Sequence, residues 1–226
     1  MAIVRGALAA AALCCGLGAA QADPVPISRA ETLLFMTPHL KDVQPPQRLH
    51  YAFRKTGTLE QGFSDTVDID ITGEADGSKK GAARFFTGQR RIAYPDVERA
   101  EGNPVLLFYL EREIREMARL TGGQANHFRQ RIRSTLADAA KIEDVDLRFG
   151  GRTMRAQQIT ISPYESDPNR DRYQRLAGKQ YVFTICDSIP GLVYQVRGVV
   201  PAPGGSSNEP AVLEETLTFT SAGALK

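Results

Sequence analysis

The chain has 226 residues, and its 28 Lys and Arg nearly balance its 26 Asp and Glu, leaving a formal net charge of +2. A balance this close to neutral excludes a global electrostatic attraction to nucleic acid or to an anionic membrane surface. The length suits one domain that buries most of its chain surface, and 42% hydrophobic residues are enough to build its core.

Residues 1–22 carry the marks of an export signal. Arg5 precedes an apolar run from 6 to 20, and the stretch closes on Ala20-Gln21-Ala22, the small-x-small pattern that signal peptidase requires. We predict cleavage after Ala22 and a periplasmic mature chain with no transmembrane segment, because no run reaches about 20 strongly apolar residues. One cysteine, Cys186, remains after cleavage, so an intramolecular disulfide is excluded.

Residues 23–47 are predicted to form a proline-rich arm. Its five prolines lack an amide hydrogen and restrict the residue before them, so regular structure is not expected to run through the segment. The apolar patch 33–36 (LLFM) is expected to pack on the single domain predicted for residues 48–226. The alternative is that the arm covers a ligand pocket as a detachable plug.

From residue 48 the hydrophobic pattern repeats every second residue. This alternation predicts half-buried antiparallel strands near 48–54, 66–72, 82–86 and 90–94, which we interpret as a four-stranded meander. Asp68 and Asp70 fall on the outward phase of the second strand, where a solvated surface explains them better than a metal site.

Two helices are predicted next. Asn103 and Pro104 suit the start of the first, and its apolar residues recur every three or four positions as far as Gly122-Gly123. The face opposite its apolar stripe carries charged residues, Glu113 and Glu116 among them, and is expected to be solvated. The second helix is expected from about 124 to 141, with the first as an αα-hairpin over the sheet.

The alternating pattern returns after Asp144 and predicts strands at 145–149, 152–162, 179–186, 192–200 and 212–220. A polar segment with Asp167 and Tyr173 is expected to form one or two helical turns. The predicted fold class is α+β, a curved antiparallel sheet of about eight or nine strands resembling a half-barrel. The αα-hairpin is inserted after the fourth strand and packs on one face of this sheet.

Two segments, 55–63 (KTGTLEQGF) and 102–113 (GNPVLLFYLERE), resemble a group of exported proteobacterial proteins to which no function is assigned. The resemblance extends over most of the mature chain, and it implies a periplasmic single domain without known catalytic residues. In outline the predicted architecture also resembles periplasmic lipoprotein carriers, which hold acyl chains between a curved sheet and its covering helices. No shared motif supports the second resemblance, and a fold does not fix a function.

A search for catalytic and metal-binding residues gives no candidate. His39, His50 and His127 have no partner at metal-ligand spacing, and Asp187 beside Cys186 disfavours a thiolate. Nucleophile-elbow, phosphate-loop and dinucleotide motifs are missing from the sequence. The segment 167–171 imitates the start of a calcium loop, but its sixth and twelfth positions do not fit, so we interpret it as a turn. We therefore predict no cofactor, no metal and no enzymatic activity.

Three functions remain as hypotheses. The leading one is a periplasmic carrier of a lipid or another hydrophobic ligand, held between sheet and hairpin. The seven residues expected to line its site are Tyr51, Phe53, Leu107, Leu110, Ile114, Tyr181 and Phe183. The second is an envelope protein-interaction module without a pocket, which binds another protein through an edge strand or through the helical face that carries Arg129 and Arg133, because guanidinium groups suit carboxylate and phosphate. The third is an unrecognised enzyme in which a histidine meets a carboxylate or Cys186.

Overall fold

The computed structural model describes residues 26–204 and 209–225. The predicted signal segment, residues 1–22 with its cleavage after Ala22, lies outside the described residues. Eight strands of the described part form one antiparallel sheet in the order β3-β2-β1-β8-β7-β6-β5-β4, with β3 and β4 as open edges. The strands are β1 Gln47–Thr56, β2 Phe63–Gly73, β3 Lys79–Phe85, β4 Lys141–Phe149, β5 Arg152–Ile161, β6 Gln180–Ile185, β7 Val193–Val200 and β8 Leu213–Ala224.

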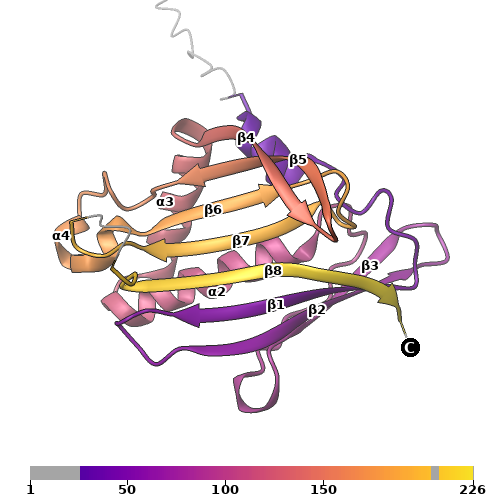
Figure 1. The fold of residues 1–226 in the computed structure, drawn as a ribbon, viewed down its shortest axis with the longest axis horizontal. Helices are drawn as coiled ribbons and strands as arrows, with labels where there is room; N and C mark the ends of the chain where they lie inside the picture. The colour runs from indigo at the N-terminus through magenta and orange to yellow at the C-terminus, as the bar shows by residue number, and fades with distance from the viewer. Residues whose placement is uncertain (1–25, 205–208, 226) are drawn as a thin grey trace, which may run out of the picture.

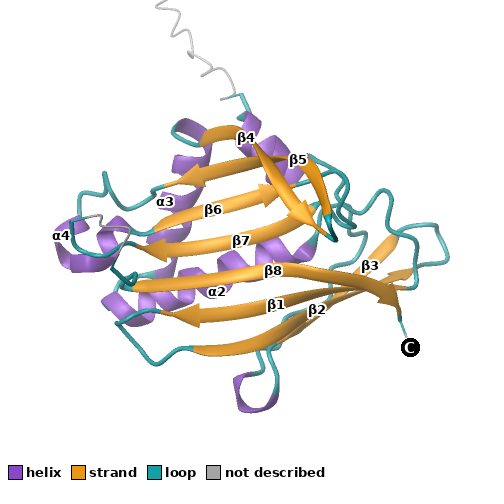
Figure 2. Cartoon of the chain, in the orientation of Figure 1, coloured by secondary structure: helices purple, strands orange, loops and turns teal. Residues whose placement is uncertain are grey.

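The helices lie on one face of this twisted sheet, as Figures 1 and 2 show. They are α1 Arg29–Glu31, which continues into the π-helical turn η1 Thr32–Met36, then α2 Pro104–Thr121, α3 Ala125–Asp138 and the short α4 Arg170–Tyr173. Two 3-10 turns, η2 Gly88–Arg90 and η3 Gln174–Gly178, complete the list. The predicted α+β class, with an αα-hairpin packed on one face of an antiparallel sheet, is confirmed. Within the described residues no helix has both the length and the hydrophobicity needed to cross a membrane.

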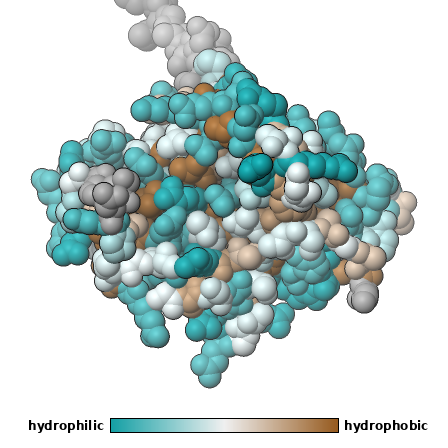
Figure 3. Space-filling view, viewed as in Figure 1, coloured by the Kyte–Doolittle hydropathy of each residue, from teal (hydrophilic) through white to brown (hydrophobic). Residues whose placement is uncertain are grey.

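Strand alternation divides the sheet into a covered and an uncovered face. In β1, Leu49, Tyr51 and Phe53 are at most 1% exposed, and Tyr51 pairs across the sheet with Phe219 of β8. The other face is polar: on it the Arg48 Nη2 donates to Asp70 at 2.9 Å. Hydrophilic and weakly polar surface predominates on this uncovered face in Figure 3. The core therefore lies between the sheet and the helices.

Capping residues position α2 as predicted. The Asn103 side chain accepts a hydrogen bond from the Val105 amide at 3.2 Å, and Pro104 occupies the first helical position. At the other end Gly122 adopts φ 68°, a left-handed conformation that glycine tolerates without strain. The second helix ends at Asp138, three residues before the predicted end, because Lys141 already opens β4.

The predicted fourth strand at 90–94 is wrong. After β3 the chain turns away at Phe86, whose φ is 66°, and enters η2. Further pairing is limited to two isolated bridges, of Phe85 with Ile92 and of Gly81 with Val97. Since Pro95 has no amide hydrogen to extend a ladder, the αα-hairpin follows the third strand instead of the fourth.

The arm forms more regular structure than its prolines indicate. Ser28 and Glu31 make a reciprocal capping box that starts α1, beyond the last of the early prolines. Leu34 and Leu40 are 1% exposed, so the arm packs on the rest of the chain through them. Phe35 and Met36 stay exposed.

Candidate functional site

A groove runs over the outer side of the αα-hairpin, on the surface turned away from the sheet. Its volume is about 380 Å³. Leu110, Ile114, Ile132 and Leu136 form its buried floor, and Leu107 stands at its border. The remaining lining residues are Ile27, Glu31, Phe35, Met36, Glu111, Arg129 and Arg133. Three segments that are distant in sequence, 27–36, α2 and α3, thus build one apolar depression.

Exposed apolar side chains gather at this groove. Five large hydrophobic side chains are exposed in the described residues, and four of them border it: Ile27 (60%), Phe35 (37%), Met36 (59%) and Leu107 (53%). The fifth, Leu59, lies elsewhere. Single exposed hydrophobic residues need no explanation, but a contiguous group of them marks a surface that another molecule covers.

Charged residues border the groove, and one of them, Arg133, has no ion-pair partner among the described residues. Glu111 accepts from Arg129 at 2.9 Å and from Arg115 at 3.3 Å. Glu31 accepts from the Ser28 amide at 3.0 Å, as part of the capping box. Arg133 forms no ion pair or side-chain hydrogen bond with the described residues. The border therefore presents Arg133, a guanidinium without an ion-pair partner among the described residues, beside apolar surface.

The structure divides the seven residues predicted to line one ligand site into two groups. Leu107, Leu110 and Ile114 line the groove, together with Arg129 and Arg133 from the separate anion-binding prediction. The four aromatic residues are at most 1% exposed and belong to the core on the other side of α2: Tyr51, Phe53, Tyr181 and Phe183. One helix therefore separates the two sets.

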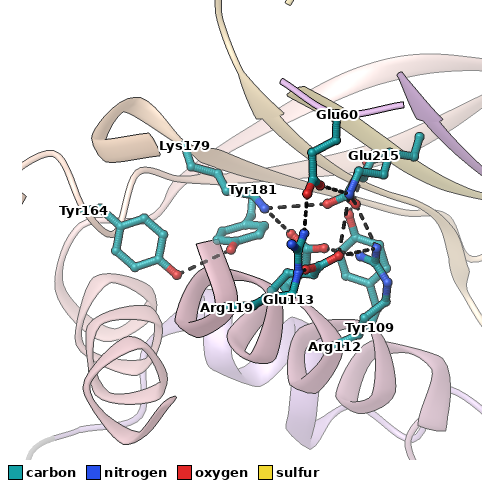
Figure 4. A network of polar contacts seen from close by, with 11 residues as sticks. Glu60, Tyr109, Arg112, Glu113, Arg119, Tyr164, Lys179, Tyr181 and Glu215 are labelled. Atoms are coloured by element: carbon teal, nitrogen blue, oxygen red, sulfur yellow. Dashed lines mark hydrogen bonds and ion pairs between the residues drawn. The ribbon is translucent and has the colours of Figure 1, made fainter. Parts of the chain in front are cut away.

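Between α2 and the sheet lies a network of buried charges, drawn in Figure 4. The sheet supplies Lys55 of β1, Glu215 of β8 and Lys179 just before β6, and α2 supplies Arg112 and Glu113. All five side chains are at most 6% exposed. The register explains the meeting on the sheet side: Lys55 pairs with Glu215, Glu215 with Gly198, and Gly198 with Tyr181 in one row across four strands.

Close contacts hold this network together. Lys179 Nζ lies 2.5 Å from Glu113 Oε2 and 3.6 Å from Glu215 Oε2. The Arg112 guanidinium bridges both carboxylates, at 2.6 Å from Glu113 Oε1 and 2.8 Å from Glu215 Oε1. Gly198 makes room for them, since a Cβ there would lie 3.1 Å from Glu113 Oε2. Lys55 extends the network outward to Glu60 at 2.7 Å, and Arg119 contacts the same carboxylate at 2.7 Å.

The two buried carboxyl groups have opposite pKa shifts. Burial, followed by the charge of Glu215, raises the pKa of Glu113 to about 7. Burial also acts to raise the pKa of Glu215, but the charges of Lys179 and Arg112 outweigh it and hold that pKa well below its ordinary value. Close carboxylates repel each other's second charge, so the pair favours one ionised and one protonated member.

The network occupies the place where the carrier hypothesis expected a ligand. Tyr109 donates to the Glu215 carbonyl at 3.2 Å, and the Tyr164 and Tyr181 hydroxyls lie 3.4 Å apart beside it. Two of the four predicted aromatic lining residues contact these charges: Lys179 Nζ lies 5.4 Å from the Tyr181 ring centre, and the Arg112 guanidinium lies 4.9 Å from that of Phe53. An acyl chain placed there would displace charges from their partners, which is strongly unfavourable.

The sequence carries one signal for this network, which is the position of two charged residues in their strands. Lys55 and Glu215 stand on the inward phase of their strands, in step with Phe53 and Leu217. The prediction of a solvated charged face on α2 is wrong for Glu113, which is 0% exposed. A buried ion network is indicated where charged residues occupy inward positions on two adjacent strands and on the helix that covers them.

The histidines have three different surroundings. His50 on the uncovered face of the sheet lies 2.8 Å from Asp68. His39 is buried, where it contacts the Leu33 carbonyl at 2.7 Å, and burial lowers its pKa. His127 Nε2 lies 2.7 Å from the buried Asp167 carboxylate. A histidine does therefore meet a carboxylate, as the enzyme hypothesis required.

The enzyme hypothesis also named Cys186 as a group that a histidine could activate. Cys186 is buried, and its Sγ lies 3.5 Å from the Arg155 carbonyl. Among the described residues no group of three or more His, Cys, Asp or Glu side chains is placed to hold a metal ion.

No protein-family model matches the sequence, and no curated protein matches it. The resemblance of segments 55–63 and 102–113 to exported proteobacterial proteins therefore stays a prediction. The chain is similar in fold to MucB in the Pseudomonas aeruginosa MucA/MucB complex, with 16% identity and a TM-score of 0.37 over 87% of this chain and 57% of that one. Across three MucB structures the chain spans 52–57% of the matched chain.

Other similar structures are a Mycobacterium tuberculosis lipoprotein, LppX, and a LolA superfamily protein from Nitrosomonas europaea. LppX shares 10% identity over 76% of this chain and 84% of that one, with a TM-score of 0.32. The LolA superfamily protein shares 8% identity over 87% and 94%, with a TM-score of 0.24. These similarities concern the outline of the fold alone.

Proposed function

We propose that the chain is an exported, non-enzymatic binding protein that holds the apolar chain of an anionic amphiphile in the groove over α2 and α3. The gathering of four of the five exposed large hydrophobic side chains at this groove carries the proposal. Covering apolar surface is favourable by roughly 25 cal/mol per Å². A hydrocarbon chain lying in the groove would cover these side chains.

The charge at the border favours an anionic head group. Arg133 has no carboxylate partner among the described residues, whereas Glu31 and Glu111 are already engaged. A guanidinium group forms paired hydrogen bonds with carboxylate or phosphate. The head group would therefore lie at Arg133, with Arg129 beside it.

The size of the groove suits a small ligand. About 380 Å³ lies near the lower end of the volumes of small-molecule sites, which run from roughly 300 to 1,000 Å³. The ligand would lie on the outer side of the hairpin, not between hairpin and sheet as first hypothesised. Phe35 and Met36 of the arm would form one wall, so the arm takes part in the site. The predicted periplasmic address, with cleavage after Ala22, would expose the groove to envelope lipids.

Calorimetric titration with saturated fatty acids of increasing length tests this proposal. Each methylene buried contributes about 0.8 kcal/mol, so the affinity should rise roughly fourfold per methylene until the groove is full and then level off. Leu107→Lys should weaken binding at least tenfold. Leu59→Lys is the matched control, because Leu59 is also exposed but lies outside the groove. A fatty alcohol of equal length should bind more weakly than the acid.

The alternative is the envelope protein-interaction module, with an apolar segment of another protein on the same surface. Pull-downs from periplasmic extract with wild type and with Arg129 and Arg133 both changed to Glu distinguish the two. If fatty acids do not bind and the double variant loses a protein partner, the amphiphile proposal is wrong and the alternative holds. The amphiphile proposal would also be wrong if a fatty acid bound the Leu107→Lys variant as tightly as it binds wild type.

A further inference from the structure

A second depression lies at the other end of the αα-hairpin, where α2 turns into α3. Its volume is about 310 Å³. Its lining comes from the turn 121–124, from His127 on α3 and from Asn169, Arg172 and Tyr173 at α4. None of these residues lines the groove. The site is therefore separate from the one proposed for the amphiphile.

A buried carboxylate organises this site. Asp167 has a fully buried side chain, and its Oδ2 lies 2.7 Å from His127 Nε2 and 3.3 Å from Arg131 Nε. Its Oδ1 accepts from the Asn169 amide at 2.7 Å. The turn expected at 167–171 thus forms around Asp167, and both carboxylate oxygens are engaged by protein donors. These contacts fix the His127 ring.

The orientation of His127 leaves one ring nitrogen for a ligand. Because Nε2 faces Asp167, Nδ1 is the nitrogen that remains, and it has no hydrogen-bond partner among the described residues. A protonated imidazole donates from both of its nitrogens. His127 is 33% exposed, so a solute can reach it.

The other lining residues add donors and no negative charge. Arg172 forms no ion pair with the described residues, and no Asp or Glu is among the residues that line this depression. Asn169 contributes an amide side chain and Tyr173 a hydroxyl. The first turn of α3 also borders the site, and the side chain of its N-cap residue, Gln124, does not cap the backbone amides of that turn.

We infer that this depression binds a phosphate group, carried either by a small soluble molecule or by a lipid head group. Imidazole, guanidinium, amide and hydroxyl groups on two separate elements suit an anion with several acceptor oxygens. The planar guanidinium of Arg172 would contact two of those oxygens, and the ring held by Asp167 would contact another. The residues singled out in the sequence at 167–172 then serve an anion, not calcium.

Titration of the full chain with inorganic phosphate, monitored by phosphorus NMR, tests the inference. We expect saturable binding with a dissociation constant below about 10 mM. Arg172→Gln and His127→Gln should each weaken it roughly tenfold or more, because each removes a charge-assisted hydrogen bond. Arg175→Gln is the matched control, since Arg175 is exposed on the same segment but does not line the depression. Leu107→Lys should leave phosphate binding unchanged, which separates this test from that of the groove.

A second arm uses vesicles with and without an anionic phospholipid. Binding to the anionic vesicles that requires Arg172, without saturation by inorganic phosphate, assigns the phosphate to a lipid head group. Saturation by inorganic phosphate that requires Arg172 assigns it to a soluble molecule. If neither binds, or if Arg175→Gln weakens binding as much as Arg172→Gln, the inference is wrong. Arg172 is exposed, so its variant tests the site even if His127→Gln does not fold.

Discussion

The two faces of α2 reverse the usual distribution of side chains, with charged residues on the buried face and apolar residues on the exposed face. The face toward the sheet carries Arg112 and Glu113, with side chains at most 6% exposed, whereas the face toward solvent carries Leu107, which is 53% exposed. Charges are thus buried where apolar residues are expected, and apolar side chains are exposed where charges are expected. The exposed apolar surface supports the proposed binding role, and the buried ion pairs connect the helix to the sheet.

The largest expected effect comes from breaking the buried network at Glu215. Glu215→Gln removes the carboxylate that Arg112, Lys179 and Lys55 share, and it should lower the free energy of unfolding by about 3–5 kcal/mol. Urea unfolding of the purified variant measures this. The neighbouring Glu214 pairs with Arg197 and is partly exposed, so Glu214→Gln should cost at most about 1 kcal/mol. If both variants lost the same unfolding free energy, the buried position of Glu215 would contribute nothing beyond that of an exposed ion pair.

The next effect concerns the space that the network needs. Gly198→Ala would place a methyl group 3.1 Å from Glu113 Oε2 and 3.2 Å from the Tyr109 hydroxyl. Overpacking of this kind typically costs roughly 1–3 kcal/mol. Thermal unfolding compares it with Gly223→Ala, where a Cβ meets no atom within 4 Å. If Gly198→Ala unfolded at the same temperature as wild type, the network could make room for a methyl group without losing stability.

The pH dependence sharpens the comparison between the two buried carboxyl groups. The pKa of Glu113 is raised from 4.5 to about 7 in the folded state. The stability that its protonation contributes is therefore fully present below pH 4.5 and is lost as the pH rises through about 7. Glu113→Gln cannot titrate, so wild type should lose stability relative to this variant between about pH 4.5 and 7. A constant difference between the two unfolding free energies over that range would mean that Glu113 does not titrate there.

The smallest effect on stability is expected on the groove face. Leu107→Ser should change the free energy of unfolding by at most about 0.5 kcal/mol, because Leu107 is largely exposed. Ile114→Ala, in the floor of the same groove and 4% exposed, should cost about 2–4 kcal/mol. Urea unfolding of both variants checks this. A large loss for Leu107→Ser would show that this side chain serves packing and not binding.

Much of the fold followed from local patterns in the sequence. Alternation in β1, the Asn103 cap and the apolar stripe of α2 depend on neighbouring residues, so they predicted strands and helices correctly. The strand at 90–94 failed because pairing depends on distant partners, and Phe86 turns the chain away from them.

The candidate site followed from the sequence only in part. The groove joins residues 27–36 to α3, which no local pattern reveals, and an apolar stripe does not show which helix face meets the sheet. Leu107 and Leu110 were predicted to line a site between hairpin and sheet, whereas in the structure they line the groove on the outer side of the hairpin. Lys55 and Glu215 were visible as inward charges, but their shared partners on α2 depend on the tertiary fold.

Methyl NMR of wild type during titration with a fatty acid tests the central claim that ligand binds on the outer face of α2. Binding in the groove predicts shift changes at Leu107, Leu110 and Ile114, which line it. It predicts no change at Leu217 and Val196, which are buried on the covered face of the sheet. Changes at Leu217 and Val196, with Leu107 unaffected, would place the ligand between the helices and the sheet and would show that the groove is not the binding site.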